Sequence, residues 1–120
     1  MIVTMKHKVA ELEGALLDAA VALADGHDVR LVGNGGPEVS FWAVGRRKRC
    51  NQYATDWEHG GRIIERERIG IEFQPRDGVW VAFCFSYIDG ILLEQLGPTL
   101  LIAAMRAYVA AKFGDEVELP

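Results

Sequence analysis

The segment Tyr53–Gly61 (Tyr-Ala-Thr-Asp-Trp-Glu-His-Gly-Gly) gathers the most unusual set of functional side chains in the chain. Asp56 is of the type that caps helices and turns, and Trp57 can either fill a core or anchor an interface. One interpretation is structural: Trp57 inserts into the core and pins a loop, and Gly60-Gly61 turns the chain. The functional interpretation is a recognition loop that binds a partner.

The basic cluster Arg46-Arg47-Lys48-Arg49 is a second candidate site. Residues 46–76 carry a net charge of +3, whereas residues 1–45 carry −3 and residues 77–120 carry −4. Cationic side chains displace counterions from nucleic acid, and neighbouring aromatic rings can stack on unpaired bases. The alternative is a solvated loop or strand end, and the acidic flanks would repel a polyanion.

The glycine-rich segment Gly33-Asn34-Gly35 resembles the opening of a nucleotide-binding motif but does not continue it. Glu38 occupies the position of the third glycine, Pro37 intervenes, and a strand rather than a helix is expected to follow. Phosphate binding by this motif requires a helix N-terminus, so the segment is predicted to be a turn.

The remaining reactive side chains do not form a recognisable catalytic or metal-binding pattern. Cysteine and histidine are scattered without metal-ligand spacing, at Cys50, Cys84, His7, His27 and His59. The four cations before Cys50 could lower the pKa of its thiol, with His59 nine residues on as a generic base. Glu65 and Glu67 alternate with arginines, which is typical of a solvated ion-pair surface. We therefore expect neither catalysis, nor a metal, nor a cofactor.

Hydrophobic spacing predicts two helices that flank several strands. The apolar positions between Val9 and Leu23 recur every three or four residues, which predicts a helix over 10–25. A second helix, over 98 or 99 to 113, is apolar nearly all round and must be covered on more than one side. Strands are expected at 28–32, 39–44, 69–73 and 79–83, with a hairpin turn at 74–78.

Other segments give weaker signals. We expect a long polar loop over 46–61, an ambiguous stretch over 62–68, and a tail that frays over 115–120. Residues 84–97 are expected to form an irregular connection, with one helical turn at 91–95.

Composition places the chain among single soluble domains. Of its 120 residues 50% are hydrophobic, yet the longest apolar stretch, Val79–Phe85, is far shorter than the roughly 18 residues of a membrane span. Two widely spaced cysteines and no signal peptide indicate free thiols in a cytoplasm. The prediction is one α+β domain over 1–120: a small, mainly antiparallel sheet, with the two helices packed together on one face. The last helix, over 99–113, could also form a homodimer contact.

Several blocks of the sequence resemble the NinX-like family of phage and prophage proteins. They are Glu11–Asp18 with Val21-Ala22, Thr55-Asp-Trp57, Gly60-Gly61, Ile63–Arg66, Gly97-Pro-Thr99, Leu101–Val109 and Gly114–Val117. The resemblance implies a cytoplasmic accessory protein encoded by a phage or prophage. The stretch 33–50 departs from the family pattern, so the resemblance supports no role for the basic cluster.

We therefore expect a non-enzymatic module that binds a host or phage protein. The candidate binding residues, most of them positions that match the family motif, are Tyr53, Asp56, Trp57, Gly60, Gly61, Ile64 and Glu65. The alternative function is nucleic-acid binding through Arg46, Arg47, Lys48 and Arg49 with the nearby aromatic side chains.

Overall fold

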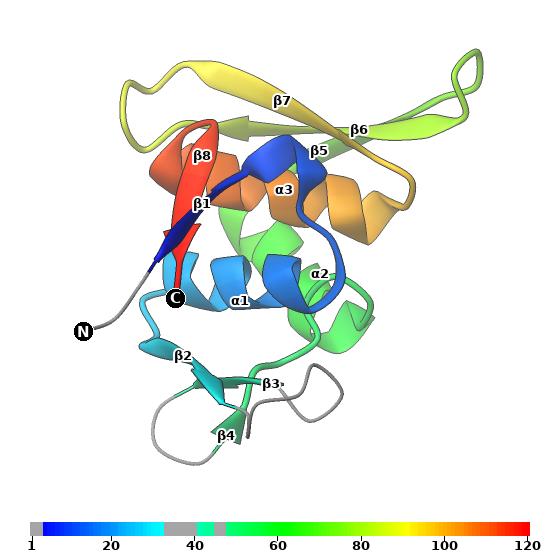
Figure 1. Ribbon diagram of the computed structural model, residues 1–120. Coiled ribbons are helices and arrows are strands. Elements are labelled where there is room, and N and C mark those ends of the chain that lie inside the picture. Colours follow the sequence, from blue (N-terminus) through cyan, green and yellow to red (C-terminus); the bar gives the residue numbers. More distant parts are fainter. Residues whose placement is uncertain (1–3, 33–40, 45–47) are drawn as a thin grey trace.

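Helix α3 (Leu100–Phe113) runs through the middle of the protein, and the other elements are arranged around it (Figure 1). The computed structural model describes residues 4–32, 41–44 and 48–120, with the backbone alone described at 31–32, 41–44 and 48–49. From top to bottom in Figure 1, the layers are a three-stranded sheet, α3, a pair of helices and a second small sheet. The α+β class predicted from the sequence is confirmed.

The upper sheet consists of β5 (Gly70–Gln74), β6 (Val79–Phe85) and β7 (Leu92–Gly97), all antiparallel, in the order β5-β6-β7. The predicted hairpin between β5 and β6 is confirmed: Gly78 has φ +66° and its N–H donates to the Gln74 carbonyl at 2.8 Å. Along β6, Ala82 and Cys84 are buried on the face that packs on α3.

The expectation of an irregular connection over 84–97 is wrong. Strand β6 extends to Phe85, the turn is confined to 86–91, and β7 pairs with β6 in the register Phe85↔Leu92 to Trp80↔Gly97. The Leu-Leu-Glu-Gln-Leu sequence favours helix locally, which is why the sequence predicts a helical turn at 91–95. Pairing with β6 and cover from α3 override that weak preference.

Helix α1 (Gly14–Ala24) packs against α3, as predicted, but on the side of α3 that faces away from the upper sheet (Figure 1). It begins four residues later than the spacing predicted. A short 3-10 helix, Val9–Glu11, comes first, and Leu12 and Glu13 are then extended. The Leu12 carbonyl accepts a hydrogen bond from the buried Arg106 Nε at 2.8 Å, which holds this break in place.

The C-terminal tail does not fray; it forms strand β8 (Glu116–Leu119), antiparallel to β1 (Met5–Lys8). Val117 and Leu119 point inward and are buried, while their neighbours Glu116 and Glu118 are exposed. The sequence Glu-Val-Glu-Leu-Pro is acidic, but its alternation is that of a half-buried strand.

The lower sheet contains β2 (Val29–Val32), β3 (Phe41–Val44) and β4 (Lys48–Arg49), in the order β2-β3-β4. The strands predicted over 28–32 and 39–44 are confirmed as β2 and β3, whereas the predicted turn at 33–37 lies outside the described residues.

The long loop expected over 46–61 is wrong at both ends. Lys48–Arg49 pairs with β3, and residues 57–61 open helix α2 (Trp57–Glu67). Residues 62–67 of the ambiguous stretch are therefore helical, and Arg68 ends the helix in a left-handed conformation.

A polar network fixes the C-terminal end of α2 to α1 and α3. The Arg66 guanidinium donates to Asp25 Oδ1 at 2.8 Å, to Glu67 Oε2 at 2.9 Å and to the Tyr108 hydroxyl at 3.1 Å. Tyr87, in the β6–β7 turn, donates to the other oxygen of Glu67. Burial raises the pKa of the Glu67 carboxyl, but the hydrogen bonds from Tyr87 and Arg66 outweigh it and lower that pKa.

The apolar composition of α3 is explained within one chain, since nearly all its side chains from Leu101 to Ala111 are buried there. A homodimer contact through 99–113 stays a prediction. Within the described residues, no helix has the length and apolar character needed to cross a membrane.

Strand β8 is predicted to be essential for stability. The Leu119→Ala substitution removes a fully buried side chain and should lower the free energy of unfolding by about 2–5 kcal/mol. The exposed neighbour Glu116 provides the control, because Glu116→Ala should change stability by less than about 0.5 kcal/mol. Urea unfolding followed by circular dichroism measures both. Equal stability of the Leu119→Ala variant and the wild type would mean that the tail is frayed.

Candidate binding site at the start of α2

Asp56 begins α2 by capping it. Its backbone is extended (φ −110°, ψ 114°), and its carboxylate Oδ1 accepts the Glu58 N–H at 2.9 Å. This bond satisfies one of the free N–H groups of the first helical turn. The chain enters the cap through a tight turn, because the Asp56 N–H donates to the Gln52 carbonyl at 2.8 Å. The backbone position of Trp57, the first residue of α2, is therefore fixed by the turn that precedes it and by the cap bond to Glu58 that follows it.

Tyr53, rather than Trp57, pins this segment to the core. Tyr53 is only 5% exposed, and Trp57 is 58% exposed. The structural interpretation of the sequence, in which Trp57 inserts into the core, is thus wrong. Two large aromatic residues four positions apart are equivalent in a sequence pattern, and the turn at Gln52–Asp56 decides which one faces inward.

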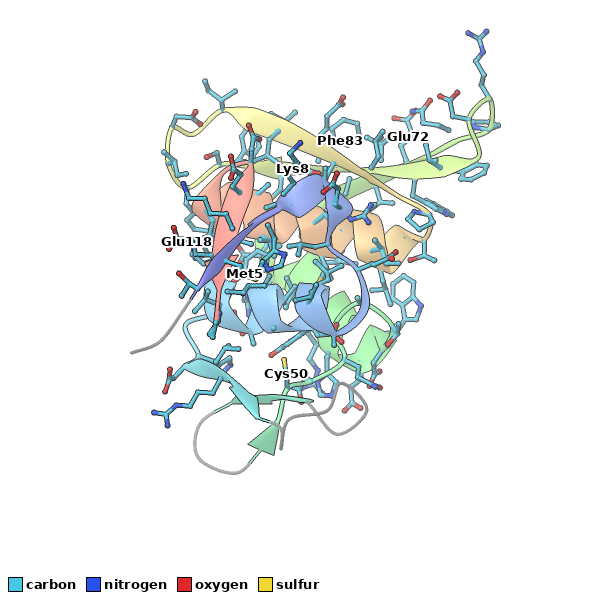
Figure 2. All side chains as sticks on the ribbon, viewed as in Figure 1. Met5, Lys8, Cys50, Glu72, Phe83 and Glu118 are labelled. Atoms are coloured by element: carbon cyan, nitrogen blue, oxygen red, sulfur yellow. The ribbon has the colours of Figure 1, made fainter. Side chains whose placement is uncertain are left out.

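The segment is also tied to α1 through Asp18. The Asp18 carboxylate Oδ1 accepts the Ala54 N–H at 2.9 Å, and the Asp18 carbonyl accepts the Cys50 thiol at 3.2 Å. Figure 2 shows the Cys50 sulfur directed toward α1. Burial raises the pKa of Asp18 from 3.8 to about 6, and burial together with the charge of Asp18 raises the pKa of Cys50 to about 12. Burial and the charge of Asp18 thus act against the lowering of the Cys50 pKa that the four preceding cations could cause.

Gly60 and Gly61 lie inside α2 and do not turn the chain, contrary to the structural interpretation. A Cβ at Gly60 would collide with the Tyr53 carbonyl oxygen and lie 2.8 Å from Leu101 Cδ2. Gly60 therefore lets α2 approach both Tyr53 and the start of α3. A Cβ at Gly61 would meet only Trp57 Cε3, at an ordinary 3.5 Å.

A hollow of about 280 Å³ opens between the N-terminal ends of α2 and α3. Trp57, Ala54 and Thr55 line one wall, and residues 99–102 line the other. Thr99 caps α3, since its hydroxyl accepts the Ile102 N–H at 3.1 Å. We call this space the Trp57 hollow. Its lining is mostly apolar and contains no charged side chain among the described residues.

The candidate residues divide into an inward and an outward set. Tyr53 and Gly60 are buried, and Ile64 packs half-buried against the core. Trp57, Gly61 and Glu65 follow one another at four-residue spacing and share one face of α2, on which Trp57 and Glu65 are exposed. Sequence reasoning missed the second wall of the hollow. The available signal was the Gly97-Pro-Thr99 block, which opens α3 beside it.

Asp56, Glu58 and His59 form a small surface group whose ligand atoms all lie within 4.8 Å of one another. The group is explained by helix capping and by ion pairing. One Asp56 oxygen is used by the cap, His59 Nε2 lies 3.8 Å from the other, and Glu58 pairs with Arg62 at 3.5 Å. Two other reactive side chains considered in the sequence analysis, Cys50 and Glu65, are not part of this group. The Cys50 thiol is directed at α1, where it donates to the Asp18 carbonyl.

Little of the basic cluster falls within the described residues. Arg46 and Arg47 lie outside them, and only the backbone of Lys48 and Arg49 is described, as strand β4.

Comparison with known proteins gives one family match. A family model described as "Bacteriophage P22, NinX" matches residues 8–112, which include α1, α2, all of α3 except its last residue, and every candidate binding residue. This confirms the resemblance seen in the sequence. None of the curated proteins matches the chain.

The two glycines of α2 are predicted to respond in opposite ways to alanine. Gly60→Ala forces apart the start of α2, Tyr53 and Leu101, and should lower the free energy of unfolding by about 1–3 kcal/mol. Gly61→Ala meets no obstruction and removes backbone entropy from the unfolded chain, so stability should rise by up to about 1 kcal/mol. Chemical denaturation of the pair tests this. A Gly60→Ala variant as stable as Gly61→Ala would contradict the close approach.

Asp18 is predicted to make stability depend on pH between about 4 and 6. Its pKa is higher in the folded state, so the folded state binds the proton more tightly and stability falls as pH rises through this window. Asp18→Asn removes the titration and keeps an acceptor for Ala54. The variant should match the wild type near pH 4 and exceed it by up to about 3 kcal/mol above pH 6.

Thermal denaturation from pH 4 to 8 measures the difference, with the exposed Asp28→Asn as control. A constant gap between Asp18→Asn and wild type across the range would show that Asp18 is not the titrating group.

Proposed function

Because the chain belongs to the Bacteriophage P22 NinX family, we propose that it is a phage or prophage accessory protein that binds another protein and catalyses no reaction. Its place of action is the cytoplasm of the bacterial host, and its partner is a host or phage protein. The binding surface is the Trp57 hollow with the exposed face of α2.

The observation that carries this proposal is the exposed Trp57 on the rim of an apolar hollow. Tryptophan supplies a large contact area with little loss of side-chain entropy, and such residues dominate binding energy when they enter a pocket on a partner. The hollow beside it can in turn receive an apolar side chain. The Asp56 cap, the Ala54–Asp18 bond and the Thr99 cap hold its walls before any partner arrives, which reduces the entropic cost of binding.

The character of the hollow favours a protein partner over a nucleic acid. The first-turn N–H groups that a phosphate would use are already engaged in part, by Asp56 in α2 and by Thr99 in α3. No Lys or Arg lines the hollow among the described residues. Phosphate recognition depends on such cations, whereas an apolar anchor does not.

The proposed absence of a reaction is supported by the reactive side chains in and just before α2. Burial and the charge of Asp18 raise the pKa of the Cys50 thiol, which favours the protonated form over the nucleophilic thiolate. The Asp56–His59 pair stands on the surface, and Asp56 is already engaged as a helix cap.

The proposal predicts that capture of a partner depends on Trp57. Tagged wild type should retain a stoichiometric protein band from lysates of infected or lysogenic host cells after nuclease treatment. Trp57→Ala should reduce that band roughly tenfold or more, as expected for loss of a central anchor of about 2 kcal/mol. Met5→Ala, which truncates another exposed apolar side chain outside the hollow, should leave it unchanged.

Two results would contradict the proposal. Equal capture by wild type and Trp57→Ala would remove the hollow from the interface. Loss of all bound material after nuclease would instead point to nucleic acid and the basic cluster.

A further inference from the structure

Strand β7 carries a second hollow, at the opposite end of α3 from the Trp57 hollow. This space of about 290 Å³ is lined by three consecutive β7 residues, Leu93, Glu94 and Gln95, together with the β6–β7 turn and the C-terminal end of α3. Side chains of consecutive strand residues point to opposite faces of a sheet, so a space that touches all three runs along the strand's edge. We call it the β7-edge hollow.

That edge of β7 is available to another strand. In the described part of the chain β7 pairs with β6 alone. One end of the edge is closed, because the Leu96 carbonyl accepts a hydrogen bond from Arg106 Nη1 at 2.9 Å and the 3-10 helix Val9–Glu11 lies nearby. The segment from Leu93 to Gln95 opens into the hollow. An edge strand presents N–H and C=O groups on its unpaired side, which an extended segment can use.

The surroundings of the hollow are unusually apolar for a surface turn. Ile88 and Ile91, which both line it, are each 65% exposed. Phe85 and Leu92 face each other across the first β6–β7 pair and are both more than half exposed. A patch of this kind at the end of a strand pair is a typical place for a partner's apolar side chain.

The charges around the hollow determine what kind of segment fits. Asp89, Glu94 and Asp115 line it, and the C-terminal end of α3 adds a partial negative charge. No cation lines it among the described residues. The two cations of residues 77–120 are engaged elsewhere: Arg106 donates to main-chain carbonyls, and Lys112 lies 3.7 Å from the centre of the Tyr87 ring.

A second copy of the chain is a poor occupant for this edge. Antiparallel pairing of two β7 strands through the same edge would bring the Glu94 side chains of the two copies close together. Like charges near one another across strands destabilise the pairing.

We propose that the β7-edge hollow binds an extended segment of a partner protein that joins the sheet as a strand beside β7. The segment carries an apolar residue that enters the hollow between Ile88 and Leu93, with lysine or arginine on either side, opposite Glu94 and the flanking carboxylates. This surface is separate from the Trp57 hollow, and neither depends on the other.

The experiment uses the ¹⁵N-labelled 120-residue chain titrated with two hexapeptide probes, one alternating valine and lysine and one alternating valine and glutamate. The valine–lysine peptide should shift amide signals of residues 86–95 and of the end of α3, and the valine–glutamate peptide should not. Glu94→Lys should weaken binding of the valine–lysine peptide roughly tenfold or more. Glu72→Lys, on the far edge strand β5 (labelled in Figure 2), is the matched control and should change it less than twofold.

The outcomes are distinct from those of the proposed function. Trp57→Ala should bind the peptide as the wild type does, whichever way the capture experiment ends. No shift at residues 86–95, or equal effects of Glu94→Lys and Glu72→Lys, would overturn the inference. Shifts at the same residues that depend on protein concentration without peptide would overturn it in favour of a second copy.

Discussion

The structure depends on the need to cover α3 on every side. Between Leu100 and Phe113 the only charged residues are Arg106 and Lys112, and a helix this apolar is stable only when surrounded. The upper sheet covers one side, α1 and α2 cover the other, and β8 lies alongside (Figure 1). Arg106 is buried in this arrangement, which lowers the pKa of its guanidinium. Its hydrogen bonds to the Leu12 and Leu96 carbonyls offset the cost of burying the charge and join the N-terminal segment to β7.

Close packing around α3 also creates the Trp57 hollow. Gly97 lets the end of β7 approach α3, where an added Cβ would lie 2.5 Å from the Ala103 nitrogen. Gly60 does the same for α2 against Leu101 and Tyr53. Because Gly60 lies one turn into α2 and Leu101 lies in the first turn of α3, these contacts bring the two helix starts together. The hollow between them is thus a consequence of the core, and Trp57 is left outside because Tyr53 occupies the inward position.

The elements that the sequence predicts well are those with strong local signals. The turn residues at 74–78 between two β-rich runs predict the β5–β6 hairpin, and the nearly uncharged run from Leu100 to Phe113 predicts α3. The elements that it misses are stabilised by distant partners. Strand β8 looks like a polar tail until β1 pairs with it, and β7 has a helix-favouring composition until β6 pairs with it. The residues of the candidate site divide in the same way. Asp56 is recognisable as a cap from its residue type alone, whereas residues 99–102 come to line the Trp57 hollow only through tertiary packing.

The two hollows differ in chemistry because they lie at opposite ends of the same helix. A helix of 14 residues is about 20 Å long, and its ends carry partial charges of opposite sign. At the N-terminal end, the Asp56 and Thr99 caps use part of the free N–H groups and leave an apolar surface around Trp57. At the C-terminal end, three carboxylates add to the negative end of the helix. The segments proposed to bind at the two ends therefore differ in chemistry: an apolar anchor at the N-terminal end and a cationic strand at the C-terminal end. The two proposed binding surfaces thus share one buried helix within a chain of 120 residues.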